Sequence, residues 1–249
     1  ISSLLIYNKA LTADEILQNY NAQKSRYSDA IVQSGMVLNL DAGNPLSYGG
    51  SGTTWYDVSG NAYNGTFTNS PTYNSVNDGV MVFAGSNDYI ALPTSGLAFG
   101  TGQFSVEAWV YTTSITTNNI IYASQSSNVS GFITLYYSNT SGFGLSDFNG
   151  SVRITTFNTT TLSTNTWYHV VGIRNASNQY VVYVNTVVST TNNASTLSIA
   201  TADPRIAVNP ATSGERWVGR IGSVRMYSRA LSAAEITQNY NATKSRFGL

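Results

Sequence analysis

The 249-residue sequence contains no cysteine, which excludes disulfide bonds and thiolate metal sites and leaves the redox compartment undetermined. Charge is also scarce: only 10% of residues are charged, and 12 basic residues balance 12 acidic ones. Because nucleic-acid binders carry a concentrated basic face, this composition argues against a nucleic-acid partner. No apolar run approaches the roughly 18 residues of a membrane-spanning helix, so we expect no membrane insertion.

Short polar side chains dominate instead. Ser, Thr and Asn make up about a third of the chain, beside 21 Gly and 17 Tyr. Such a composition is typical of many short strands joined by polar turns, and it favours an extracellular or virion-surface location over a cytosolic one. The sequence begins at Ile1 without Met or a signal-like stretch, so we expect a fragment or processed piece of a longer protein.

One segment occurs twice. Ile1–Tyr27 aligns without gaps with Ile221–Phe247, and 16 of the 27 pairs are identical, which indicates duplication. Each copy is predicted to form a strand and then a short helix. In the second copy Ser232 and Glu235 have the spacing of a capping box, flanked by a Leu231–Ile236 hydrophobic staple. The first copy repeats this arrangement with Leu11, Thr12, Glu15 and Ile16.

Between the copies the sequence has the pattern of strands. Apolar or alternating segments bounded by Gly, Asn, Ser and Pro recur over some 180 residues. They cover residues 36–42, 79–85, 88–93, 104–111, 119–124, 131–137, 151–157, 166–174, 180–188 and 205–210. We therefore predict an all-β fold, a two-sheet antiparallel jelly-roll sandwich with a short C-terminal helix.

The duplication suggests how the chain is divided. We predict that residues 1–27 are the tail, strand plus helix, of a preceding repeat, and that residues 28–249 form one complete domain. The alternative is that residues 1–27 are an integral part of that single domain.

The order of several motifs resembles a known family. These are "GMVLNLDAGNP", "GTTWYDVSGNAYNG", "VMVFAGSNDYIALP", "FSVEAWVY", "TWYHVVGIRN" and "GRIGSVRMYSRALSAAEITQNYNA". From Gly35 onward the sequence resembles the laminin-G-like, concanavalin A-like lectin/glucanase superfamily, in the cysteine-free form found in bacteriophage and bacterial surface proteins.

The resemblance implies a jelly roll of two curved sheets and a role in carbohydrate binding or adhesion, often in tandem arrays. On virions it implies a decoration or fibre module. The expected partners are glycans or cell-surface polysaccharide, neighbouring copies, or other virion and surface proteins. The disulfide typical of animal laminin-G domains is absent, so the calcium and receptor binding of that branch is not carried over.

Catalytic residues are not evident. A retaining glucanase of this superfamily needs two carboxylates about 5 Å apart on one strand face. Glu107 has only Ser105 and Trp109 as same-face neighbours, and His169, the one histidine, lies in an apolar strand segment typical of a packed residue. We therefore predict no enzyme activity and no catalytic residues.

Binding residues are harder to predict. Asp57 and Asn61 in "DVSGNAYNG" suggest a calcium site, but turn chemistry explains the same pattern and we favour it. No cofactor is required, although calcium remains possible.

Aromatic rings stack on sugars, and several lie near predicted loops or strand ends, among them Tyr56, Tyr136, Phe143 and Phe148. Our ligand-binding candidates are Tyr48, Trp55 and Tyr137. Adjacent Tyr136 and Tyr137 must point to opposite faces of their strand.

Three functions follow. We favour a non-catalytic carbohydrate-binding or adhesion module of a multi-domain surface or virion protein. The alternative is a purely structural module of a virion or surface array, and a glycan hydrolase is the least favoured. The sugar, the oligomeric state and the number of repeats are not specified by the sequence.

Overall fold

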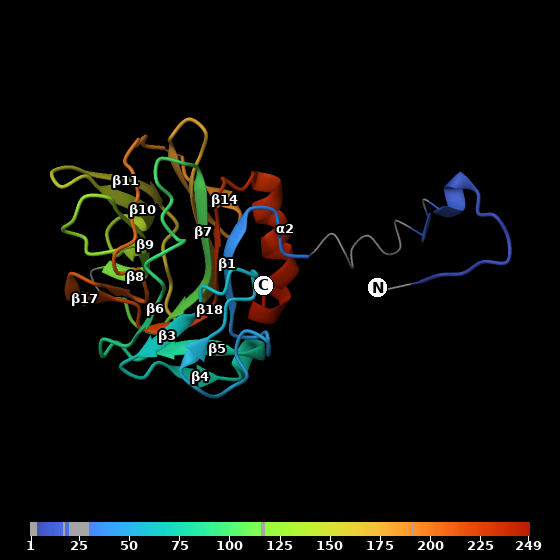
Figure 1. Ribbon diagram of the computed structural model, residues 1–249, viewed down its shortest axis with the longest axis horizontal. Coiled ribbons are helices and arrows are strands. Elements are labelled where there is room, and N and C mark those ends of the chain that lie inside the picture. Colours follow the sequence, from blue (N-terminus) through green and yellow to red (C-terminus); the bar gives the residue numbers. More distant parts are fainter. Residues whose placement is uncertain (1–3, 17, 20–29, 116–117, 191) are drawn as a thin grey trace.

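The computed structural model describes residues 4–16, 18–19, 30–115, 118–190 and 192–249. Residues 30–249 form two antiparallel sheets packed face to face, with one short helix at the C-terminal end (Figure 1). This confirms the predicted two-sheet sandwich. No helix in the described part of the chain combines the length and the apolar character needed to cross a membrane.

The first sheet has the order β14-β13-β12-β7-β18-β5-β4, with β1 also pairing β18. Its strands are β1 (Met36–Asp41), β4 (Thr72–Asn74), β5 (Val80–Phe83), β7 (Phe104–Thr112), β12 (Trp167–Arg174), β13 (Tyr180–Val184), β14 (Val187–Val188) and β18 (Gly219–Tyr227). The strand of the second sequence repeat is β18, and it lies in the interior of the sheet between β7 and β5.

The second sheet has the order β11-β10-β9-β8-β15-β6-β3-β2. Its strands are β2 (Thr54–Trp55), β3 (Gly65–Thr68), β6 (Tyr89–Ala91), β8 (Asn118–Ala123), β9 (Phe132–Ser138), β10 (Gly142–Phe148), β11 (Arg153–Asn158) and β15 (Arg205–Ile206). A small hairpin of β16 (Val208–Asn209) and β17 (Thr212–Arg216) lies beside β8. The sequence pattern missed β10, because its two glycines and Asp147 break the apolar alternation, and it did not predict β2, β3, β4 or β17.

Period-2 alternation builds the core between the sheets. Strand β1 alternates buried and half-buried residues, and Leu38 and Leu40 point inward. Strand β7 is buried almost throughout, because Val106 and Val110 face the core while Trp109 faces a second apolar layer on the outside. A strand buried on both faces therefore indicates that something covers the outer surface of its sheet.

The covering element is α2 (Ala233–Thr243), continued by the 3₁₀ turn Lys244–Phe247. Figure 1 shows α2 against the β1 and β18 side, opposite β8 to β11. Its first turn has the predicted capping box, in which Ser232 Oγ accepts from Glu235 N at 3.3 Å. Ile236 is fully buried against Val171 and Tyr227 of the first sheet. The short 3₁₀ turn η1 (Val76–Asp78) joins β4 to β5.

The strand expected at the start of the first repeat is not formed. Residues 4–7, the described part of that expected strand, have no strand structure, whereas residues 13–16 are helical as predicted. A strand needs a neighbour to accept its backbone hydrogen bonds, and the described residues supply none to residues 4–7. Residues 1–3 lie outside the described residues.

Candidate functional site

The outer face of the second sheet carries a hollow of about 290 Å³. Along β9 the side chains of Phe132, Thr134 and Tyr136 form its floor, while the alternate residues Ile133 and Leu135 face the core. No helix of the described residues covers this face, yet the floor residues are almost inaccessible, with Phe132 1% and Tyr136 9% exposed. They are sheltered by the walls of the hollow, which neighbouring segments supply.

Those walls come from four segments of the chain. Strand β8, the loop after it, β11 and the β16–β17 hairpin converge around the floor. They contribute Asn118, Ile120, Ser127, Asn128, Arg153, Asn209 and Glu215. The rim is thus mainly polar, and most of its polar groups are planar amides or charged groups that can each make two directed hydrogen bonds.

Arg153 is held at the rim by its contacts with the floor. Its guanidinium carbon lies 5.2 Å from the centre of the Phe132 ring and 5.4 Å from that of Phe148, within cation–π range. Its Nη2 donates to the Ser127 carbonyl oxygen at 3.3 Å and its Nη1 to Ser146 Oγ at 3.4 Å. The residue is nevertheless exposed, so this positioned cation also faces solvent.

Glu215 provides the acidic group of the rim. Its Oε1 accepts from Asn118 Nδ2 at 2.7 Å and its Oε2 accepts from Asn209 Nδ2. These bonds join β8, β16 and β17 and fix the orientation of the carboxylate. The rim therefore offers fixed acceptors as well as the donors of Arg153.

Tyr136 lies on the floor beside a tight glycine contact. Its ring meets Phe157 edge to face at 5.9 Å. A Cβ atom on Gly144 would lie 2.8 Å from the Phe157 ring and 3.0 Å from the Tyr136 ring, so glycine is what allows the two rings to sit there. Burial raises the pKa of the Tyr136 hydroxyl, which is therefore neutral at physiological pH.

The three aromatic residues that we had put forward as ligand contacts lie elsewhere. Tyr48, Trp55 and Tyr137 are 5%, 0% and 4% exposed and belong to the core between the sheets. Their rings pack in that core, with Tyr48 stacked on Phe67 at 5.4 Å, while Tyr137 also lines a separate surface hollow of about 340 Å³ beside Asn139 and Thr161. As the alternation predicts, Tyr137 faces the core and its neighbour Tyr136 faces the hollow.

The loop of Asp57 and Asn61 has turn geometry. Asp57 Oδ1 accepts from the backbone N–H groups of Asn39 and Ser59 at 2.8 and 2.9 Å, and its Oδ2 accepts from Tyr63 N and Ser59 Oγ. Asn61 donates its amide to the Val37 carbonyl oxygen at 3.1 Å. Four donors directed at one carboxylate favour the turn interpretation over a calcium site. In the described part of the chain, no three His, Cys, Asp or Glu side chains gather as they would around a metal.

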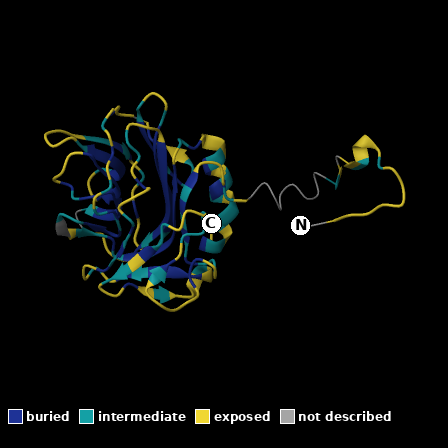
Figure 2. Ribbon diagram, viewed as in Figure 1, coloured by how far each residue is buried: buried dark blue, intermediate teal, exposed yellow. Residues whose placement is uncertain are grey.

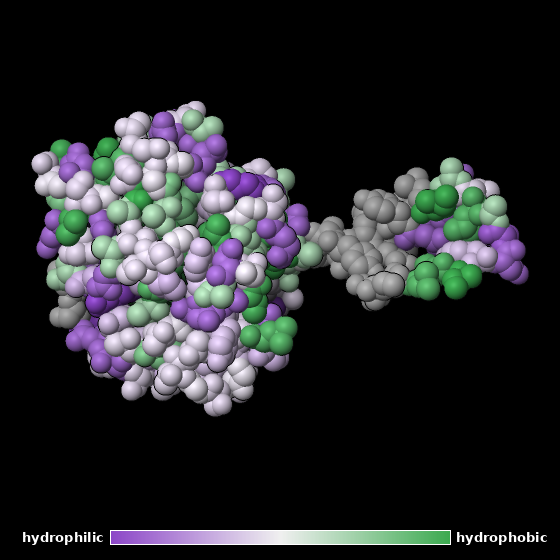
Figure 3. All heavy atoms as spheres, in the orientation of Figure 1, coloured by the Kyte–Doolittle hydropathy of each residue, from purple (hydrophilic) through white to green (hydrophobic). Residues whose placement is uncertain are grey.

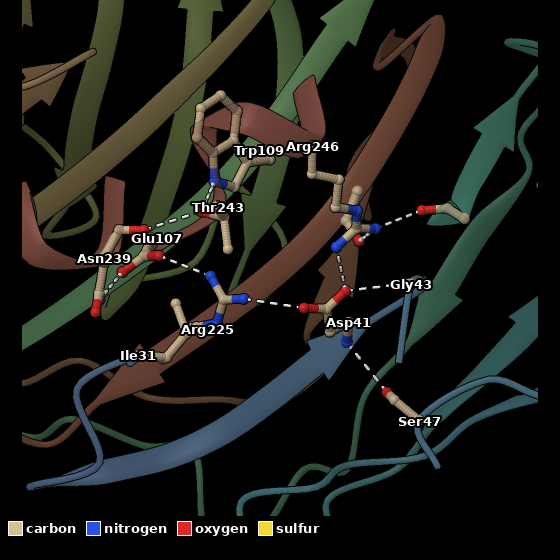
Figure 4. A network of polar contacts seen from close by, with 12 residues as sticks. Ile31, Asp41, Gly43, Ser47, Glu107, Trp109, Arg225, Asn239, Thr243 and Arg246 are labelled. Atoms are coloured by element: carbon tan, nitrogen blue, oxygen red, sulfur yellow. Dashed lines mark hydrogen bonds and ion pairs between the residues drawn. The ribbon is translucent and has the colours of Figure 1, made fainter. Parts of the chain in front are cut away.

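Glu107 lies on β7 of the first sheet, outside the hollow, and Figure 4 shows it beside Asn239 of α2. It is fully buried, with Oε2 accepting from Asn239 Nδ2 at 2.6 Å and Oε1 lying 3.2 Å from His169 Nε2. Burial alone would raise the pKa of Glu107, but His169, Arg225 and Asn239 together outweigh it and lower the pKa to about 2. A covered carboxylate that stays ionised is unsuited to act as the proton donor of a glycosidase.

The same network continues across the first sheet (Figure 4). Arg225 donates to Glu107 Oε1 at 2.9 Å and to Asp41 Oδ2 at 3.1 Å, and Arg246 donates to Asp41 Oδ1 at 2.6 Å. Arg246 follows α2, so the chain of ion pairs ties the C-terminal segment to β1. The two carboxylates are thus separated by a guanidinium and do not form a pair.

The comparison with known families decides the identity of the fold. The profile of the concanavalin A-like lectin/glucanases superfamily matches residues 84–237, more than half of the chain. The chain belongs to this superfamily. The matched stretch runs from just after β5 into α2, and so includes the hollow together with Glu107, His169 and Arg225 of the buried network. No curated protein matches the chain.

Solved structures of this lectin/glucanase superfamily fold include carbohydrate-associated proteins. Domain 4 of an extracellular arabinanase from Geobacillus stearothermophilus, solved with arabinotriose, is 20% identical with a TM-score of 0.68; the match covers 83% of this chain and 98% of that domain. The binding domain of Paraclostridial Mosquitocidal Protein 1 is 13% identical (TM-score 0.65; 84% of this chain, 52% of that one). Trypanosoma rangeli sialidase with sialic acid is 16% identical (0.63; 94% and 39%). At these identities the likeness shows the fold.

Proposed function

We propose that this chain is a non-catalytic carbohydrate-binding module and that the hollow on the second sheet is its sugar site. The observation that carries the proposal is an apolar aromatic floor, Phe132 and Tyr136, ringed by the fixed planar groups of Arg153, Glu215 and Asn118. A sugar ring has apolar C–H faces and hydroxyl edges. Such a ring matches a site whose base is aromatic and whose rim carries paired donors and acceptors.

The fold relatives support this proposal. One of them was solved with arabinotriose and another with sialic acid, and a third is the binding domain of a mosquitocidal protein. Since no residue correspondence is carried over at these identities, the class of ligand is proposed and the particular sugar is left to experiment.

The absence of catalysis is part of the proposal. Glu215 is the only carboxylate among the described residues that line the hollow, whereas a retaining glycosidase needs two about 5 Å apart. Glu107, the acid in the strand that the sequence pointed to, is covered by α2. We further propose that the module is part of an extracellular surface or virion protein, as a decoration or fibre module. It requires no cofactor.

Affinity electrophoresis against a polysaccharide panel that includes arabinan, followed by titration of the strongest binder, tests the proposal. We expect Tyr136→Ala and Arg153→Ala each to weaken binding at least about tenfold, or ~1.4 kcal/mol, because each removes a wall or floor contact. Tyr56→Ala is the matched control, since Tyr56 is 53% exposed and lies outside the hollow. Chelator is expected to leave binding unchanged.

Two results would count against this function: retardation by none of the polysaccharides, or parent-like affinity in both hollow variants. The first would favour the second candidate, a purely structural module of a surface or virion array. That alternative draws its support from the duplicated terminal segment rather than from the hollow.

A further inference from the structure

Residues 12–15 reproduce the helix start of the C-terminal closing segment. The Thr12 N–H donates to Glu15 Oε2 at 2.9 Å and Glu15 N donates back to Thr12 Oγ1 at 3.3 Å. The equivalent bonds between Ser232 and Glu235 have the same two lengths. Both copies therefore fold to the same capped helix start.

The contacts between strand and helix are repeated as well. Asn19 Nδ2 donates to the Tyr7 hydroxyl at 3.0 Å, and Asn239 Nδ2 donates to the Tyr227 hydroxyl at 3.0 Å. A cation pairs with the capping glutamate in both copies, from Lys9 in the first and from Arg229 in the second. The first copy thus keeps the helix start and the tyrosine contact of the closing segment, although its residues 4–7 are not paired as a strand.

The two copies differ in what covers them. In the first copy the apolar side chains are open to solvent (Figures 2 and 3), whereas every aligned side chain in the second is fully buried. The pairs are Leu4 at 73% exposed and Val224 at 0%, Ile6 at 85% and Met226 at 0%, Tyr7 at 43% and Tyr227 at 0%, and Ile16 at 57% and Ile236 at 0%.

These exposed groups belong to two faces. Val224 and Met226 face the core between the sheets, while Tyr227 and Ile236 meet each other under α2. Residues 224–227 of β18 reach both faces because side chains alternate along a strand, and this part of the strand lies between β7 and β1. A domain that receives the first copy must therefore take it up as an inserted strand between two of its own strands, rather than bind it on the surface of a complete sheet.

We infer that residues 4–19 are the closing strand and helix of another sandwich of this same kind, and dock in the slot that β18 and α2 fill here. The receiving domain is a jelly roll with a gap between its equivalents of β7 and β1. Such strand insertion supplies main-chain hydrogen bonds along both edges, and the alternating side chains give specificity.

The sequence of the first copy adds a chemical requirement. Leu5 stands where the second copy has Arg225, the partner of buried Glu107. A carboxylate opposite Leu5 would be buried without its cation, which costs several kcal/mol. The domain that receives residues 4–19 therefore carries an apolar residue at the position equivalent to Glu107.

Matched variants of the chain as it exists provide the first test. Ile236→Asp is expected to destabilise the sandwich strongly, and Ile16→Asp to leave its thermal midpoint unchanged, since Ile16 has no buried partner here. Equal destabilisation by both would overturn the inference, because residues 4–19 would then dock on their own domain.

The second test supplies a domain that can receive residues 4–19, joined to them in one chain. In an extended chain, residues 30–220 bearing Glu107→Leu are placed directly before residues 1–249, so that residues 1–27 follow them as residues 221–247 normally do. We expect amide hydrogen exchange over residues 4–16 to slow by on the order of a hundredfold relative to the 249-residue chain. Ile16→Asp is now expected to unfold the upstream unit.

A sister chain, whose upstream unit keeps Glu107 and is closed by residues 221–249, controls for folding. If that unit folds and the one followed by residues 1–27 does not, the inference is wrong. Unchanged fast exchange over residues 4–16 beside a folded upstream unit would overturn it equally.

Discussion

A single buried residue, Arg225, offsets the negative charge of the carboxylates buried under α2. It is 1% exposed and lies between the carboxylates of Glu107 and Asp41. Asp41 has Arg246 as a second cation, but Glu107 has only His169 and the neutral Asn239 besides. The stability of the face under α2 therefore depends on Arg225 more than on any rim residue of the hollow.

We predict that Arg225→Met lowers the free energy of unfolding by about 3–5 kcal/mol, because it leaves Glu107 buried without its guanidinium. The double variant Glu107→Leu/Arg225→Met is expected to regain at least half of the loss, since no unpaired carboxylate remains beside β7. Urea unfolding at neutral pH measures both. A single variant as stable as the parent, or a double variant no more stable than the single, would contradict the account.

At the scale of elements, the residues of the first turn of α2 both predict the helix and stabilise it. Ser232, Glu235 and the Leu231–Ile236 pair predict the first turn correctly, because capping depends only on neighbours three to five residues apart. The strands with a clear apolar alternation, such as β1, β7 and β12, were predicted for the same reason, since alternation is local. Strand β10 and residues 4–7, the described part of the expected first strand, show the limit. Strand β10 forms despite its glycines because β9 and β11 flank it, whereas residues 4–7 have no partner strand among the described residues.

The pH dependence of this element follows from Glu235. The hydrogen bond from Arg229 is the main cause that lowers its pKa to about 2, from an ordinary value of 4.5. A carboxyl whose pKa is depressed on folding adds stability above its unfolded pKa and loses that contribution as the pH falls. We therefore predict that Glu235→Gln costs up to about 1 kcal/mol at neutral pH.

That difference should shrink between about pH 4.5 and pH 2 until parent and variant unfold alike, as urea titrations across this range would measure. Glu15→Gln, the same change in the first copy, serves as the control and should leave unfolding of the sandwich unaltered. A Glu235→Gln penalty that stays constant down to pH 2 would show that the ionised carboxylate is not what stabilises α2.

At the scale of the whole molecule, the two faces have separate roles in this account. The first sheet is closed by α2 and its ion pairs, and the second sheet bears the open hollow. The sequence predicted the sandwich but not the hollow, because Asn118, Arg153 and Glu215 come together only when β8, β11 and the hairpin are folded. It also could not tell that the loop-adjacent rings of Tyr48 and Trp55 turn inward, since burial of those rings depends on long-range packing.

The most direct test of the central claim is a nuclear magnetic resonance titration of the isotope-labelled chain with an oligosaccharide from the strongest-binding polysaccharide. The account predicts amide shifts confined to β8, β9, β11 and the β16–β17 hairpin, around Phe132, Tyr136 and Arg153. Shifts centred on α2 and Glu107 instead, or no shift with any oligosaccharide of the panel, would contradict it.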